Sequence, residues 1–226
     1  IAISAIGWQK MLSESCSLEK ALEVCLAGQP NEMKGVVQSL LYTTVRHRAK
    51  VELLLGKLVK KPPQENTKAL LYIALALLLE GKEKAFTVVN QAVDAAKMNA
   101  ETAWSSGFIN AVLRNFLRSR SQLTTGFKTN LSAQFNAPGW WISKVRKAYP
   151  NQWRGILSTQ NKQPPLTVRV NRSQISVSDF LLKLEQNGLT GKQVGPWAVV
   201  IELALLTRFQ DFSRDYVPFK MPAVSW

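Results

Sequence analysis

The segment Gly107-Phe-Ile-Asn-Ala-Val-Leu-Arg-Asn-Phe-Leu-Arg118 carries the clearest structural signal in this chain. Its apolar side chains recur at the spacing of one face of an α-helix, and we expect that face to be buried. They are Ile109, Val112, Leu113 and Phe116. Its polar side chains at Asn110, Arg114 and Arg118 share another side of the same helix. That side is either a solvated basic edge or a surface that contacts an anionic partner.

The helical periodicity continues on the N-terminal side of this segment. Apolar residues within 1–120 recur at helical spacing, and helix-breaking residues interrupt them at Gly28-Gln-Pro30, at Pro62-Pro63 and at Gly81. Ser17 stands where a helix N-cap is expected before Leu18, and Phe86 is expected on the apolar face of the helix after Gly81. Six or seven helices joined by short loops predict a compact all-α bundle.

The C-terminal side has a different pattern. Residues 121–136 are polar and predict a linker, which we expect a protease to cut first. Two short helices follow, over 140–149 and 151–160. Alternating residues predict strands over 166–170 and 197–203, on either side of a helix over 177–186 that Ser176 can cap.

These patterns predict a mainly α chain that ends in a small α/β module. The expected domains are an all-α domain over residues 1–125 and the α/β module over residues 126–226.

The charge distribution indicates the class of partner. The chain has 226 residues with a net charge of +14, and the 77 residues between Glu101 and Asp179 hold eleven Lys or Arg and no carboxylate. Charge of one sign repels itself, and a polyanion relieves that repulsion. Aromatic residues lie among these cations, and rings combined with cations suit exposed bases and phosphates, so RNA is the favoured partner. The aromatic residues are Trp140, Trp141, Tyr149 and Trp153.

Two alternatives stay open for these features. Basic charge also serves solubility or attraction to an anionic membrane surface. A Trp in a short helix more often packs in a core or between domains, and this alternative stays open for each of the three Trp residues.

Several kinds of chemistry have no support in the sequence. Cys16 and Cys25 would point to nearly opposite faces of one helix, so we expect reduced thiols rather than a local disulfide. The single histidine, His47, lies between Arg46 and Arg48 and is expected at the surface or beside RNA rather than in catalysis. There is no Gly-rich nucleotide loop and no apolar run of membrane-spanning length. We therefore expect no catalytic residue, no metal and no membrane association.

The segment 107–118 resembles the helix G-[FL]-[IV]-N-[AG]-V-L-R of proteins with the fold of the antitermination factor NusB. Further segments resemble the bacterial 16S rRNA cytosine-5 methyltransferases called RsmB (Sun or Fmu). These are Ala137-Pro-Gly-Trp-Trp-Ile-Ser-Lys144, Lys147-Ala-Tyr-Pro150, Asn161-Lys-Gln-Pro-Pro165 and Val168-Arg-Val-Asn171. The resemblance implies a NusB-like bundle and a small α/β module that hold ribosomal RNA for a catalytic domain dependent on S-adenosylmethionine.

The sequence also departs from that family. The family's cofactor motif and two catalytic cysteines have no counterpart here, and Pro218 and Lys220 break the expected lead-in to the catalytic domain. Thr43 stands where the family usually has Gly. We therefore expect a truncated copy or fragment without its own cofactor, whose tail over 209–226 is poorly ordered or self-associates. The resemblance implies that the chain is part of an enzyme, but its own residues contain no catalytic or cofactor motif that would establish an activity.

The alternatives are a free-standing NusB-like antitermination module and a non-functional remnant. The expected partners are ribosomal RNA and either a missing C-terminal methyltransferase domain or another protein. The expected location is the cytoplasm. The residues predicted to bind RNA are Arg46, Arg48, Arg114, Arg118, Arg120, Lys144, Lys147, Arg169 and Arg172.

Overall fold

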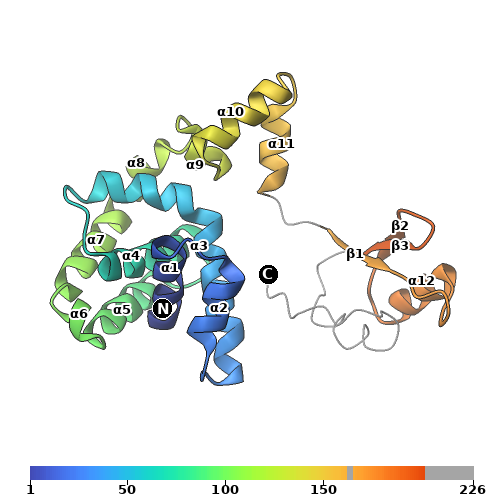
Figure 1. Cartoon of the computed structure of the whole chain (residues 1–226), viewed down its shortest axis with the longest axis horizontal. Helices are drawn as coiled ribbons and strands as arrows, with labels where there is room; N and C mark the ends of the chain where they lie inside the picture. Colours follow the sequence, from blue (N-terminus) through green and yellow to red (C-terminus); the bar gives the residue numbers. More distant parts are fainter. Residues whose placement is uncertain (162–164, 202–226) are drawn as a thin grey trace. The chain divides into compact units, whose positions relative to one another are not determined.

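The computed structural model describes residues 1–161 and 165–201. Its contacts divide the chain after Asn161 into two compact units, a helical one and a smaller one that contains a sheet (Figure 1). The prediction of a mainly α chain with a small α/β module is confirmed. The tail prediction for 209–226 falls outside the described residues.

The first unit is built around one helix that is apolar on all sides. Helix α4 (Glu65–Glu80) buries every residue from Ala69 to Leu78, and it packs against α1, α3, α5 and α7. A helix surrounded by other helices has no solvent-facing stripe, and its sequence between Ala69 and Leu79 therefore contains no charged residue. The helices that make up the bundle with α4 are α1 (Ala2–Ser13), α2 (Leu18–Leu26), α3 (Asn31–Leu58), α5 (Ala85–Lys97), α6 (Ala100–Ala103) and α7 (Ser106–Arg118).

The ends of these helices follow local chemistry that the sequence shows. The Ser17 hydroxyl accepts a hydrogen bond from the Lys20 N–H at 3.3 Å, which confirms the predicted N-cap of α2. Gly81 ends α4 with φ of +74°, a left-handed conformation that favours glycine. The predicted breaks at Gly28 and Gly81 are thus confirmed.

The predicted linker over 121–136 is wrong over most of its length. It contains most of α8 (Arg120–Thr125) and all of α9 (Leu131–Phe135), and α10 (Gly139–Ala148) and α11 (Trp153–Gln160) follow. Phe135 is buried against Trp153, with ring centroids 5.7 Å apart. Polar composition indicated a linker, but a few buried side chains are enough to hold short helices in place.

Asn136 attaches this segment to the bundle. Its Nδ2 donates to the carbonyl of Val45 at 3.0 Å, and its Oδ1 accepts from the N–H of Ala49 at 3.1 Å. Within an α-helix those two backbone groups normally bond to each other, so the Asn136 amide is placed beside the hydrogen-bond ladder of α3. Asn136 itself has φ of 47°, a conformation that Asn tolerates better than most residues.

The second unit is a three-stranded antiparallel sheet with one helix. Its elements are β1 (Leu166–Arg169), α12 (Val177–Gln186), β2 (Gly191–Gln193) and β3 (Ala198–Ile201), and the strand order is β1-β3-β2. In the register of β1 and β3, Leu166 lies opposite Ile201 and Arg169 opposite Ala198. The core residues are Val168, Val170, Ile175, Phe180, Leu184, Leu189, Val199 and Ile201.

The two predicted strands and the helix between them are confirmed as far as Ile201. Ser176 caps α12 as predicted, because its hydroxyl accepts from the Asp179 N–H at 3.1 Å. Strand β2 is not among the strands that the sequence predicted. This strand starts at Gly191, where a Cβ would lie 2.8 Å from Leu184 Cδ1, so close packing against α12 favours glycine there.

Among the residues that the structure describes, no helix combines the length and the apolar character needed to cross a membrane.

Candidate nucleic-acid interface

All nine residues predicted to bind RNA have exposed side chains. Within residues 1–161 and 165–201, none of the nine forms an ion pair with a carboxylate. The described ion pairs use Lys10, His47, Lys68 and Lys82 instead. An exposed and unpaired cation keeps its full charge available to an anionic partner.

Helix α7 has the two sides that its sequence predicts. Its apolar residues are buried in the bundle, and they are Ile109, Val112, Leu113 and Phe116. On the other side, Arg114 Nε donates to Asn110 Oδ1 at 2.9 Å. This bond along the helix orients the guanidinium before any ligand arrives.

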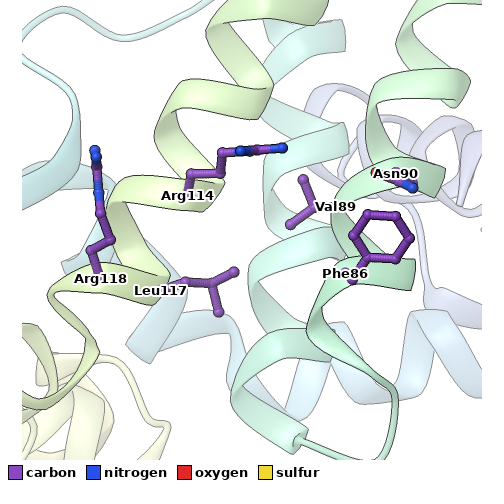
Figure 2. A pocket seen from close by; sticks show the side chains of 6 residues that line it. All are labelled: Phe86, Val89, Asn90, Arg114, Leu117 and Arg118. Carbon is purple, nitrogen blue, oxygen red and sulfur yellow. The ribbon is translucent and has the colours of Figure 1, made fainter.

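Arg114 and Arg118 line a pocket of about 390 Å³ between α5 and α7. Val89, Asn90 and Leu117 form much of its remaining lining, with Phe86 at one end. Figure 2 shows Arg114 and Leu117 extending from α7 toward α5, with Arg118 farther from Phe86 at the edge of the hollow. The pocket therefore combines two guanidinium groups, an amide and an apolar floor, which suits a phosphate next to a planar base.

Phe86 belongs to this pocket although nothing in the sequence assigned it to a site. The periodicity predicted Phe86 on the apolar face of its helix, but 71% of the residue is exposed. The expectation was wrong, because Phe86 lies in the first turn of α5 and is not among the residues of that helix that are buried in the bundle. An aromatic residue near the start of a helix indicates a binding site only when the helix that packs beside it is known.

The predicted RNA-binding residues on α3 and α8 lie outside this pocket and make other contacts. Arg46 Nη2 donates to Thr43 Oγ1 at 3.3 Å, and Arg48 is exposed without a described hydrogen bond. The Arg120 guanidinium lies 6.0 Å from the centroid of the Phe116 ring. None of these three lines the α5–α7 pocket.

His47 is half-buried rather than fully at the surface. Its Nε2 lies 2.8 Å from Glu80 Oε2, so the pair joins α3 to α4. Burial lowers the pKa of His47 from its ordinary value of 6.5. Hydrogen bonds from Lys82 and His47 lower the pKa of Glu80 to about 2. We interpret this pair as a structural clamp between two helices.

Helix α10 presents lysines and tryptophans in different environments. The Lys144 ammonium lies 5.7 Å from the centroid of Trp140, which is 63% exposed. Trp141 Nε1 donates to Gln160 Oε1 at 3.1 Å, which ties α10 to α11. Lys147 is exposed on the same helix. Trp140 is thus available at the surface, whereas Trp141 has a structural contact.

In the second unit, Arg169 and Arg172 approach one ring. Their guanidinium carbons lie 5.7 and 5.4 Å from the centroid of Trp197. The structure therefore brings together two pairs of predicted residues, Arg114 with Arg118 and Arg169 with Arg172, on separate units.

Cys16 and Cys25 are free, as predicted. Cys25 belongs to the core of the bundle, and burial raises the pKa of its thiol. A thiol with a raised pKa forms less of the reactive thiolate, so we interpret Cys25 as a structural residue.

Comparison with known families accounts for both units. The NusB family matches residues 6–118, which span α2 to α7 and most of α1. The chain belongs to the NusB family. The ferredoxin-like domain of RsmF/B-like methyltransferases matches residues 137–206, which include α10, α11 and the sheet.

Curated relatives carry the same two regions in longer chains. The chain is 30% identical over 209 residues to a "Probable ribosomal RNA small subunit methyltransferase B" of Coxiella burnetii, covering 89% of this chain and 46% of the relative. It is 28% identical over 193 residues to the "Ribosomal RNA small subunit methyltransferase B" proteins of Salmonella arizonae and Salmonella paratyphi B, covering 84% of this chain and 44% of each relative. The chain therefore spans slightly less than half the length of these relatives. The predicted resemblance to the N-terminal region of this methyltransferase family is confirmed.

Proposed function

We propose that this chain binds ribosomal RNA and positions it for a methyltransferase domain that modifies C5 of a cytosine. The pocket between α5 and α7 carries the proposal, because it holds two exposed arginines, Arg114 and Arg118, beside an exposed aromatic ring, Phe86. The names of the relatives supply the class of RNA. Ribosomal RNA as the partner implies that the chain acts in the cytoplasm.

The arginines and the aromatic ring of this pocket have different roles in the proposed RNA binding. Guanidinium groups contact phosphate oxygens with two parallel hydrogen bonds, and such contacts supply affinity and register without reading sequence. Phe86 offers a flat face to an exposed base, a contact worth about 1–3 kcal/mol where it forms. RNA has exposed bases in loops and bulges, whereas the bases of a regular duplex are stacked away from such a ring.

The cofactor of the relatives' methyl transfer does not fit this pocket. S-adenosylmethionine carries a positive sulfonium, and among the described residues the pocket lining offers two cations and no carboxylate. We therefore propose that this chain contributes RNA binding and that S-adenosylmethionine binds to another part of the enzyme.

Salt-dependent RNA binding tests the proposal. The affinity of the full chain for a structured fragment of small-subunit rRNA is measured by fluorescence anisotropy at several salt concentrations. Arg114→Gln combined with Arg118→Gln should weaken binding and lower the slope of log affinity against log salt by about 0.7–0.9 for each lost phosphate contact. Lys20→Gln with Lys97→Gln is the matched control, because both lysines are exposed on the bundle outside this pocket. An unchanged slope for the arginine variant would assign the pocket to solvated surface.

The NusB-family match over 6–118 also favours a second candidate, an RNA-binding module that acts with a protein partner. Co-purification with a ribosomal protein separates the two candidates. If the chain binds ribosomal RNA alone, RNase treatment should release the ribosomal protein. If the chain acts with a protein partner, the stoichiometric complex should survive RNase treatment.

A further inference from the structure

Trp197 stands between two arginines on the surface of the second unit. It directly precedes β3 and is 42% exposed, which is high for the largest side chain in a module this small. The guanidinium carbons of Arg169 and Arg172 lie 5.7 and 5.4 Å from its ring centroid. A cation over an aromatic ring at this distance is attracted by the ring's quadrupole.

The sheet and the loop after β1 hold this arrangement in place. The Val170 N–H donates to the Trp197 carbonyl at 2.8 Å, so the β1–β3 ladder continues to Trp197. In the loop that carries Arg172, Asn171 Oδ1 accepts from the N–H and the hydroxyl of Ser173, at 3.3 and 2.7 Å. The three side chains are therefore positioned by backbone structure before a ligand binds, which reduces the entropy that binding costs.

Open space adjoins the ring. One hollow of about 390 Å³ is lined by Arg169, Val170, Asn171, Arg172, Ser173 and Trp197. A second hollow of about 360 Å³ is also lined by Arg172 and Trp197. Among the described residues, neither hollow includes a carboxylate and neither arginine forms an ion pair.

A similar arrangement elsewhere in the chain offers a comparison, and there the Arg146 guanidinium lies 5.7 Å from the centroid of Trp153. The Arg154 guanidinium lies 4.5 Å from the centroid of Trp153. Trp153 is half-buried, it packs edge-on against Phe135, and neither Arg154 nor Trp153 lines one of the described pockets. Trp197 differs because it is exposed and has space beside it for a further planar group.

We propose that Trp197, Arg169 and Arg172 form a subsite for one unpaired nucleotide of RNA. The base stacks on the Trp197 indole, and the guanidinium groups of Arg169 and Arg172 bind the phosphates on either side of it. A nucleotide is the ligand that combines a flat π surface with adjacent anionic charge, whereas an acidic peptide would use the cations without the ring. This subsite deepens the RNA binding proposed above and rests on it.

The test compares single-stranded and double-stranded RNA on the full chain. The probes are an oligoribonucleotide of about ten residues, a length within the usual range for single-strand sites, and the same strand in a perfect duplex. Trp197→Ala should lower the affinity for the single strand about fivefold or more, because the stacking of one base is lost. The affinity for the duplex should stay unchanged, since its bases are not free to stack. Trp197→Phe keeps a ring and should retain part of the single-strand affinity.

A charge variant and a matched control complete the design. Arg172→Gln should weaken single-strand binding and lower its salt slope by about 0.7. Arg154→Gln removes the same charge from the arginine stacked on Trp153 and should leave single-strand affinity and slope unchanged. Preserved amide resonances of β1 and β3 show that each variant folds. In the wild-type chain, the indole resonance of Trp197, assigned by its loss in Trp197→Phe, should shift when the single strand is added.

The outcomes separate this subsite from the general function. If the folded Trp197→Ala and Arg172→Gln variants bind the single strand as the wild type does, the subsite is wrong although RNA binding stands. If the wild-type chain binds neither RNA, the proposed function and the subsite both fail.

Discussion

Single residues show how neighbours decide chemistry that residue type alone leaves open. Arg46, His47 and Arg48 are consecutive, yet His47 turns inward to Glu80 while both arginines are exposed. Their different surroundings follow from helix geometry, because consecutive residues point about 100° apart. His47 therefore belongs to the packing of α3 on α4, and only the arginines remain candidates for RNA contact.

The His47–Glu80 pair predicts a loss of stability in acid. The pKa of Glu80 falls from its ordinary value of 4.5 to about 2 on folding, because Lys82 and His47 hold its carboxylate. The pKa of His47 is also lowered on folding, chiefly by burial. In both cases the unfolded chain binds more protons, so stability is present above the ordinary pKa values and is lost as pH falls through 6.5 and then from 4.5 toward 2.

Glu80→Gln should lower the free energy of unfolding at neutral pH by about 1 kcal/mol, because the pair is only partly buried. It should also flatten the pH dependence below pH 4.5, the ordinary value for this group. Urea titrations followed by far-ultraviolet circular dichroism measure both effects. Glu83→Gln, at an exposed residue with no described ion pair, is the control. Equal pH profiles for the two variants would contradict the clamp.

At the scale of elements, one side chain at the end of α9 makes two hydrogen bonds to α3. The Asn136 amide bonds the Val45 carbonyl and the Ala49 N–H, and Asn136 also ends α9 in a left-handed conformation. Residues 128–130, just before α9, are exposed. The expected first protease cut within 121–136 stays a prediction, and these exposed residues are where we now expect it.

Asn136→Gly should lower the free energy of unfolding by about 2 kcal/mol, because two hydrogen bonds are lost while the left-handed backbone remains allowed. Asn136→Ala should cost about 1 kcal/mol more, since a Cβ disfavours that conformation. Limited proteolysis should cut both variants faster than the wild type near residues 128–130. A wild-type cleavage rate for Asn136→Gly would show that the two bonds do not attach α9 to the bundle.

For the whole molecule, the division into two units has consequences for stability. The bundle has a large core, whereas eight buried residues form the main core of the sheet unit. A smaller core buries less apolar surface and leaves a smaller margin of stability. We expect the two units to respond separately to core substitutions.

Phe180→Ala should remove about 3–5 kcal/mol from the sheet unit, because Phe180 is fully buried there. That loss approaches the whole stability of a small domain. Hydrogen exchange should then show lost protection in β1 and β3 and unchanged protection in α4. Leu182→Ala, at a residue that is 55% exposed on the same helix, should change stability by no more than about 0.5 kcal/mol. Parallel loss of protection in α4 would mean that the chain unfolds as one unit.

The sequence by itself determined the helices of the bundle and the family. Helical hydrogen bonds join residues four apart, so a helix can be predicted from residues that are close in the sequence. These are the apolar residues that recur along one face and the residues at the helix ends, such as Ser17 and Gly81. The motif around Asn110 and Arg114 is likewise contiguous in the chain. For the same reason, the side on which Arg114 lies could be predicted.

Only the tertiary structure decided the features that join distant residues. Asn136 bonds Val45 from 91 positions away, and the pocket beside Arg114 is completed by Phe86 from another helix. The short strand β2 exists through its pairing with β3. Such partners leave no fixed spacing in the sequence, because the chain between them can vary in length while the contact is the same. Local periodicity therefore predicted the longer helices and two of the three strands, and packing between elements decided which of their side chains form a site.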